Sequence, residues 1–224
     1  MDELLLQNMD ARRFGALFPK LAETVRELLT AANHIAPERK RLLIDTAGFI
    51  TSRTGADSGA PLVFICTHNS RRSHLCQIWA HTFAWLYGLD HVTCFSGGTE
   101  ATAFHPNAVR ALESCGFHIS SDSTSRNPHR RVTFSSLAES MEAWSKTYDD
   151  PVNPTAGFAA VMTCSDADEA CPVVPGAVAR FPIRYDDPKV ADDTPHEAEV
   201  YLQRCRQIAA EMFFLMNEVR HGDE

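Results

Sequence analysis

Short apolar runs alternate with stretches of helical spacing over most of this 224-residue chain. Apolar runs rich in β-branched and aromatic side chains are typical of buried parallel strands. Four such strands are predicted, at residues 62–65, 91–96, 157–163 and 178–184. Helical spacing predicts helices at residues 72–87, 106–116, 136–146 and 196–219. Strands and helices that alternate in this way form a parallel sheet with helices on both faces, so the predicted fold class is α/β.

The first part of the chain has a helical pattern of its own. One stripe of apolar side chains recurs at helical spacing: Leu17, Leu21, Val25 and Leu28. This helix is expected to break near Pro19, and a second helix is expected after Pro37. We therefore predict a helical extension at residues 1–55, followed by a small, polar linker. The extension contains no catalytic pattern, so we expect an arm for packing or for forming a homodimer.

Composition narrows the function classes. The chain has 29 acidic and 21 basic residues and a net charge of −8, which disfavours binding to nucleic acid or to an anionic membrane surface. An anionic substrate would have to be held by a local site. The N-terminus lacks the basic stretch of a signal peptide, and no apolar run is long enough to span a bilayer, so we expect a cytoplasmic protein. Seven cysteines without an export signal indicate thiols rather than a disulfide framework.

One loop carries the clearest chemical signal. The first predicted strand ends at Cys66, and Arg72 begins the next helix. Backbone N–H groups of such a loop converge on an oxyanion site, and the helix N-terminus and Arg72 favour the thiolate form of Cys66. A thiolate in an anion-binding loop is a nucleophile directed at a bound oxyanion. A cysteine that ends a strand is more often a small core residue. Here the strand, the loop, Arg72 and Ser73 coincide, which favours catalysis.

A second cysteine pair follows a later strand. Cys164 and Cys171 bracket a polar, acidic stretch after the strand at residues 157–163. In a parallel sheet, Cys66 and Cys164 then lie at the same edge. We expect the pair to be exposed and mobile and to act in thiol–disulfide exchange. The alternative is two incidental core cysteines beside an acidic surface loop.

These motifs resemble those of a known family. The loop from Cys66 to Ser73 resembles the catalytic loop of the low-molecular-weight phosphatase fold, which serves tyrosine phosphatases and thioredoxin-coupled arsenate reductases. CSDADEACP at residues 164–172 resembles the redox loop of those arsenate reductases, which simple tyrosine phosphatases lack. The resemblance covers residues 61–220. It implies that Cys66 is the nucleophile, Cys164 the first resolving thiol and Cys171 the second, with thioredoxin as reductant.

The resemblance also implies roles for the rest of the loop. Ser73 would steady the Cys66 thiolate, and arsenate or a phosphate-like oxyanion would be bound by the residues between them: Thr67, His68, Asn69, Ser70, Arg71 and Arg72. No metal or cofactor is expected.

A general acid is needed to protonate the departing oxygen, and an Asp before a Pro is a fitting candidate. Tyr-Asp-Asp-Pro occurs at residues 148–151 and again at 185–188. The second copy follows the last predicted strand and matches the family's acid loop, so Asp187 is the predicted acid. The first copy precedes its strand and is expected at the opposite edge, as a solvated turn.

Three positions depart from the family pattern. His68 stands where a glycine is usual, so we expect backbone strain there. Arg71 replaces a common cysteine and is expected to add positive charge near the oxyanion. Gln77 stands where some relatives carry a glutamate linked to potassium, which disfavours a potassium site here.

The sequence therefore predicts reduction of arsenate to arsenite. The rival is a phosphatase of phosphotyrosine or a small phosphoester, which needs only Cys66, Arg72, Asp187 and water. A third class is a non-catalytic binding module, which the intact catalytic set disfavours. Cys164 and Cys171 distinguish the reductase from the phosphatase.

Overall fold

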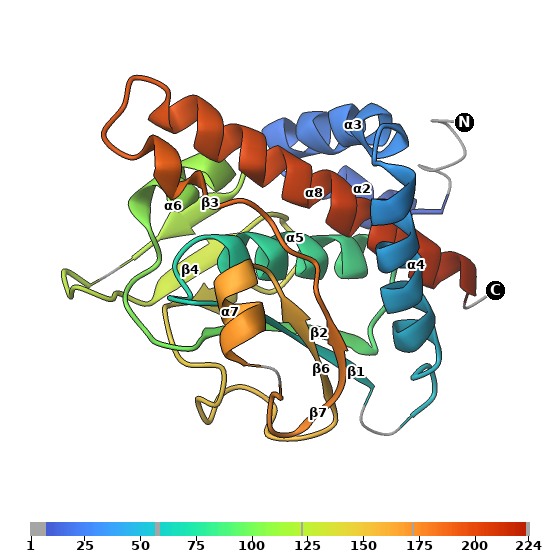
Figure 1. Ribbon diagram of the computed structural model, residues 1–224. Coiled ribbons are helices and arrows are strands. Elements are labelled where there is room, and N and C mark those ends of the chain that lie inside the picture. The colour runs from blue at the N-terminus through green and yellow to red at the C-terminus, as the bar shows by residue number, and fades with distance from the viewer. Residues whose placement is uncertain (1–7, 57–58, 122, 172, 223–224) are drawn as a thin grey trace.

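The computed structural model describes residues 8–56, 59–121, 123–171 and 173–222. The first seven residues of the extension and Pro172 of the redox motif lie outside the described residues. Four parallel strands form the main sheet in the order β2-β1-β6-β7 (Figure 1). The strands are β1 Ala60–Cys66, β2 Val92–Gly98, β6 Phe158–Met162 and β7 Ala177–Phe181. The predicted parallel α/β class is therefore confirmed.

The strand register aligns the carboxyl ends of three neighbouring strands. Cys66 lies opposite Gly98 of β2, and Ile65 lies opposite Met162 of β6. The carboxyl ends of β1, β2 and β6 consequently meet at one edge of the sheet. This is the edge at which the nucleophile loop and Cys164 emerge.

Helices cover the two faces unequally. On one face, α5 (Arg72–Leu86) packs on β1 and β2, and α8 (Glu197–Gly222) packs on α5 and α6 (Pro106–Ser114). On the other face, the short α7 (Ser165–Ala170) packs on β1 and β6. Because β1 is buried on both sides, its side chains alternate between two cores. Leu62 and Phe64 join the larger core, whereas Val63 and Ile65 join the smaller core beneath α7.

The predicted helical extension is present as α2 (Ala11–Gly15), α3 (Pro19–Asn33) and α4 (Pro37–Thr51). Figure 1 shows α3 running beside α8, and α4 also packs on α8. The apolar stripe of α3 is buried within the chain, with Leu21 and Val25 fully covered. Because the stripe is covered, it supplies no exposed surface for the homodimer that its sequence suggested. Within the described ranges, no helix combines the length and apolar character that crossing a bilayer requires.

Two predicted elements differ in the structure, one in a smaller sheet and one in the main sheet. The smaller sheet consists of the antiparallel strands β3 (His118–Ser120), β4 (Arg130–Thr133) and β5 (Met141–Ala143), so the helix predicted at residues 136–146 is wrong. The reason is visible in β5, where two buried residues flank an exposed one, the period of a strand. At the other end of the main sheet, β7 stops at Phe181, before the predicted end of that strand.

We expect that removing residues 1–55 prevents folding. The deletion uncovers the face of α8 and removes a set of fully or almost fully buried side chains: Leu21, Val25, Leu28, Leu43 and Ile50. Each contributes about 1.5–3 kcal/mol, and the whole domain is stable by only about 5–15 kcal/mol. Circular dichroism and urea unfolding of the truncated chain check this. Leu28→Ala in the full chain is the control and should cost about 2–5 kcal/mol while leaving a cooperative transition. A truncated chain that unfolds cooperatively would contradict the prediction.

Candidate active site

The nucleophile loop holds Cys66 in a chain of hydrogen bonds. Cys66 ends β1 and is 3% exposed, and its Sγ lies 3.1 Å from Ser73 Oγ. Ser73 Oγ accepts a hydrogen bond of 2.8 Å from Asn69 Nδ2. The serine hydroxyl hydrogen is therefore free to point at sulfur. The Cys66 sulfur therefore has a hydroxyl donor beside it within the loop.

The left-handed residue of the loop is Asn69, not His68. Asn69 has a φ of 43°, and its Oδ1 accepts a hydrogen bond of 2.9 Å from the Lys146 backbone N–H. Asparagine tolerates this conformation better than most residues, so the strain expected at His68 does not arise. The His68 ring instead pairs with Glu100 at 3.2 Å on the rim of the loop.

Gly98 is what allows the loop to come so close to β2. A Cβ at this position would lie 2.7 Å from both Asn69 N and Thr67 O. Contacts that short require the backbone to move, so only glycine fits beside the loop. The glycine at the carboxyl end of β2 is therefore required for steric reasons.

Arg72 and Asp187 are in direct contact. Arg72 is 7% exposed, its Nη1 donates to the Tyr185 carbonyl at 3.0 Å, and its Nη2 donates to Asp187 Oδ2 at 2.5 Å. Arg72 Nε is buried and has no hydrogen-bond partner among the described residues. Asp187 Oδ1 accepts from the Lys189 backbone N–H at 3.0 Å, so this carboxylate also begins a short 3-10 helix, η1 (Pro188–Ala191). The predicted acid thus lies at the guanidinium that is predicted to bind the oxyanion.

The side chain of Arg71 turns away from the loop. Its Nε donates to Tyr201 Oη at 2.6 Å, and its Nη2 donates to Asp192 Oδ2 at 3.0 Å. The expectation that this guanidinium adds positive charge to the oxyanion site is therefore wrong, because Asp192 compensates the charge. Only the backbone of Arg71 is left to contribute to anion binding.

The structure brings Cys164 to the nucleophile loop but keeps it buried. Cys164 is fully covered, and its Sγ lies 3.6 Å from Thr67 Oγ1. Its Sγ also accepts from the Ala167 backbone N–H at 3.4 Å, which makes it the N-cap of α7. Cys171, at the other end of α7, is partly exposed and packs on the core that contains Cys66 and Cys164. The predicted exposed, mobile pair is therefore wrong for Cys164, and all seven cysteines are free thiols.

Asp168, which was not predicted as a site residue, holds α7 in place. Asp168, at the centre of the redox motif, is buried and forms ion pairs with Arg180 of β7 and with Arg184. A buried carboxylate needs such partners because burial of an unpaired charge is costly. No local sequence signal identifies this role, because the two arginine partners lie 12 and 16 residues further along the chain.

The first Tyr-Asp-Asp-Pro copy lies at the same edge as Cys66, so its predicted place at the opposite edge is wrong. The Tyr148 backbone N–H donates to the Gly98 carbonyl at 2.9 Å, at the carboxyl end of β2. Asp150 nevertheless closes its own turn, with Oδ1 accepting from the Val152 backbone N–H at 3.1 Å. It is Asp187, and not Asp150, that contacts Arg72.

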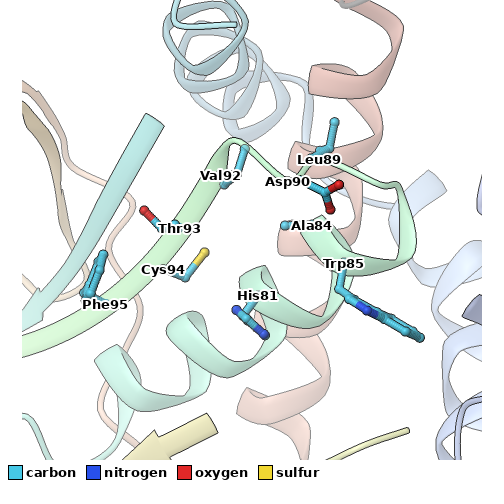
Figure 2. A pocket seen from close by; sticks show the side chains of 9 residues that line it. All are labelled: His81, Ala84, Trp85, Leu89, Asp90, Val92, Thr93, Cys94 and Phe95. Atoms are coloured by element: carbon cyan, nitrogen blue, oxygen red, sulfur yellow. The ribbon is translucent and has the colours of Figure 1, made fainter. Parts of the chain in front are cut away.

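Two other features lie apart from this chemistry. Gln77 Nε2 donates to the Cys94 carbonyl at 3.2 Å, and no three His, Cys, Asp or Glu side chains gather as a metal site in the described parts of the chain. A pocket with a volume of about 370 Å³ lies between α5 and the N-terminal half of β2. Figure 2 shows the side chains that line it, among them His81, Trp85 and Cys94. It contains no residue of the nucleophile loop.

Comparison with known proteins identifies relatives. The arsenate reductase of Shouchella clausii is 34% identical over 145 residues, which are 65% of this chain and 86% of the relative. That of Bacillus subtilis is 30% identical over 145 residues, with the same coverage. Among solved structures, a low-molecular-weight phosphotyrosine phosphatase from Vibrio cholerae is similar with 14% identity and a TM-score of 0.47, over 70% of this chain and 94% of that one. No protein-family model matches the chain.

Proposed function

This chain belongs to the arsenate reductase family, and we propose that it reduces arsenate to arsenite with Cys66 as the nucleophile. The observation that carries the proposal is the second thiol at the nucleophile loop. Cys164 Sγ lies 3.6 Å from Thr67 Oγ1, one residue from the nucleophile. A phosphatase would use water at this stage and would have no need of a thiol there.

The first step forms a covalent adduct. Backbone N–H groups of residues 67–72 and the Arg72 guanidinium hold arsenate, which replaces Asp187 at Arg72. Cys66 Sγ attacks arsenic and an As–O bond breaks. Once arsenate has displaced Asp187 from Arg72, Asp187 takes up a proton from solvent and passes it to the departing oxygen, which leaves as water. Ser73 steadies the thiolate before the attack.

The next two steps move electrons from sulfur to arsenic. The Cys164 thiolate attacks Cys66 Sγ, and the S–As bond breaks with its electron pair staying on arsenic. Arsenic(V) leaves as arsenite, arsenic(III), and a Cys66–Cys164 disulfide remains. Cys171 then attacks Cys164 Sγ, which frees Cys66 and forms a Cys164–Cys171 disulfide. Two thiols have been oxidised for one arsenate, so an external dithiol must close the cycle.

The last exchange requires α7 to unwind. Cys164 and Cys171 cap the two ends of this helix. A helix rises about 1.5 Å per residue, so seven residues separate the two Cα atoms by about 10 Å. A disulfide needs Cα atoms within about 7 Å of each other. The ion pairs of Asp168 with Arg180 and Arg184 oppose this change until the thiols react.

We propose thioredoxin as the external dithiol. Cys171 is the partly exposed end of the relay, whereas Cys66 and Cys164 are buried, so a protein reductant can reach only the Cys171 sulfur without opening the site. The cytoplasmic location and the homodimer remain predictions from the sequence.

Arsenate turnover tests the proposal. With thioredoxin, thioredoxin reductase and NADPH, we expect NADPH oxidation that depends on arsenate and on this chain. Hydrolysis of p-nitrophenyl phosphate is measured beside it. Efficient phosphoester hydrolysis without arsenate-dependent NADPH oxidation would overturn the reductase and favour the phosphatase.

Asp187→Asn should slow adduct formation by on the order of a hundredfold, because an amide is too weak an acid to protonate the departing oxygen. Arsenate should bind as tightly as before or more tightly, since the amide competes less well for Arg72. Rapid-quench measurement of arsenite release in one turnover checks the rate, and protection of Cys66 from iodoacetamide by arsenate checks the binding.

Asp150→Asn is the matched control. Asp150 closes its own turn and does not contact Arg72, so its replacement should change the single-turnover rate less than twofold. If Asp150→Asn is the slow variant and Asp187→Asn is normal, the general acid belongs to the first copy of the motif.

A further inference from the structure

Two consecutive arginines of the nucleophile loop hold the two ends of one segment. Arg72 binds Asp187, which begins η1, and Arg71 binds Asp192, which ends it. The two carboxylates are thus tied to adjacent positions of the loop. The segment between them, residues 187–192, carries the proposed general acid.

The Arg71 end is the better anchored of the two. Tyr201 Oη accepts from Arg71 Nε at 2.6 Å and donates to Asp192 Oδ1 at 2.6 Å, so three side chains close a ring of hydrogen bonds. Tyr201 lies on the long helix α8 and is 1% exposed. Burial, and then the bond to Asp192, raise the pKa of the Tyr201 phenol, so it stays a donor to the carboxylate.

Binding of arsenate breaks the Arg72–Asp187 interaction but leaves the Arg71–Asp192 interaction in place. Arsenate and Asp187 require the same guanidinium of Arg72, so an oxyanion in the loop breaks the Arg72–Asp187 bond. While arsenate is bound, the Arg71–Asp192 ion pair connects the nucleophile loop to residues 187–192. This is the state in which Asp187 must stay close enough to protonate the departing oxygen.

We propose that Arg71 is a positioning residue that, through Asp192 and Tyr201, keeps the Asp187 segment over the nucleophile loop while arsenate occupies Arg72. The proposal rests on the proposed function, because it assumes that Asp187 is the general acid. It assigns a role to the position at which this chain carries an arginine instead of the cysteine that is common in the family.

The test separates the rate of adduct formation from arsenate affinity. Arg71→Met keeps the length of the side chain and removes its charge and its donors. We expect the single-turnover rate of arsenite release at saturating arsenate to fall by about tenfold, since small displacements of a catalytic group have effects of this size. Arsenate affinity, from protection of Cys66 against iodoacetamide, should change less than threefold.

Asp192→Asn should give the same pattern, and the double variant should be no slower than the slower single variant, because both act on one interaction. Arg71→Lys should recover at least half of the lost rate, since its ammonium can still pair with Asp192. Arg206→Met is the matched control. It removes another arginine–carboxylate pair, with Glu27 at 2.9 Å, at a distance from the loop, and should leave the rate within twofold.

Single variants that keep the wild-type rate would overturn the proposal. So would a loss of arsenate affinity equal to the loss of rate, because that is the result of a distorted loop. If the wild type does not reduce arsenate, the proposed function is wrong, but the positioning role can still be tested. The test then compares how much each variant slows the hydrolysis of phenyl phosphate and of p-nitrophenyl phosphate. A misplaced acid slows the poorer leaving group more, whereas equal slowing contradicts the role.

Discussion

Cys171→Ser should release one equivalent of arsenite and then stop. Cys164 can still resolve the Cys66 adduct, because it lies against the nucleophile loop. The product is a Cys66–Cys164 disulfide between two buried residues, which thioredoxin cannot reach. Cys164→Ser should fail one step earlier, with arsenic still bonded to Cys66, because no other thiol of the relay contacts the loop. Steady-state turnover should therefore be lost in both variants, and only the single-turnover yield of arsenite separates them.

Peptide mapping completes this experiment. After one turnover, the wild type should contain a Cys164–Cys171 bridge and Cys171→Ser a Cys66–Cys164 bridge. Cys115→Ala is the matched control, because it removes a sulfur that lies 3.9 Å from Cys205 in another buried pair, and it should turn over normally. Phosphoester hydrolysis should be unchanged in all three variants. If both relay variants reduce arsenate at the wild-type rate and mapping finds no bridge, the relay is wrong.

Cys66→Ser should abolish both arsenate reduction and phosphoester hydrolysis, by at least about a thousandfold, because a serine hydroxyl is not ionised at neutral pH. Arg72→Lys should also be severely impaired. The guanidinium donates simultaneously to the Tyr185 carbonyl and to Asp187, and an ammonium cannot reproduce that planar fork around a tetrahedral oxyanion. Initial rates with arsenate and with p-nitrophenyl phosphate measure both losses.

Folding must be checked beside these rates. Arg72 is 7% exposed, so its replacement affects packing as well as binding. Near-ultraviolet circular dichroism shows whether the fold is kept. Arg39→Lys is a useful control, because Arg39 is another largely buried arginine, paired with Glu211 at 2.7 Å, outside the loop. If a folded Cys66→Ser or Arg72→Lys variant has normal activity, the nucleophile loop is not the catalytic site.

The sequence predicts the catalytic loop well because the loop depends on local signals. A run of apolar residues, a turn and a helix start follow one another from β1 to α5, and this order alone places Cys66 and Arg72 at one sheet edge. The same reasoning predicts Cys164 beside Cys66, since both follow parallel strands. Local pattern also identifies the break at Pro19.

The errors arise where distant residues decide the local structure. The acidic stretch after Cys164 looks like an exposed loop, but it forms the short helix α7. Asp168 of this helix pairs with Arg180 of β7 and with Arg184, and these partners allow its carboxylate to be buried. Arg71 looks like an additional oxyanion ligand, but Asp192 and Tyr201, more than a hundred residues later, turn its side chain away. Spacing along the chain contains no information about either partner.

The packing of α3 and α4 on α8 has a consequence for how the chain folds. These helices occupy residues 19–51, whereas their partner occupies residues 197–222, so the pairing closes one of the longest loops in the chain. During synthesis the apolar stripe of α3 emerges before α8 and stays uncovered until α8 has been made. Contacts at such sequence separation slow folding, because the chain between them must be ordered first. Helices α3 and α4 are therefore expected to be among the last elements to dock.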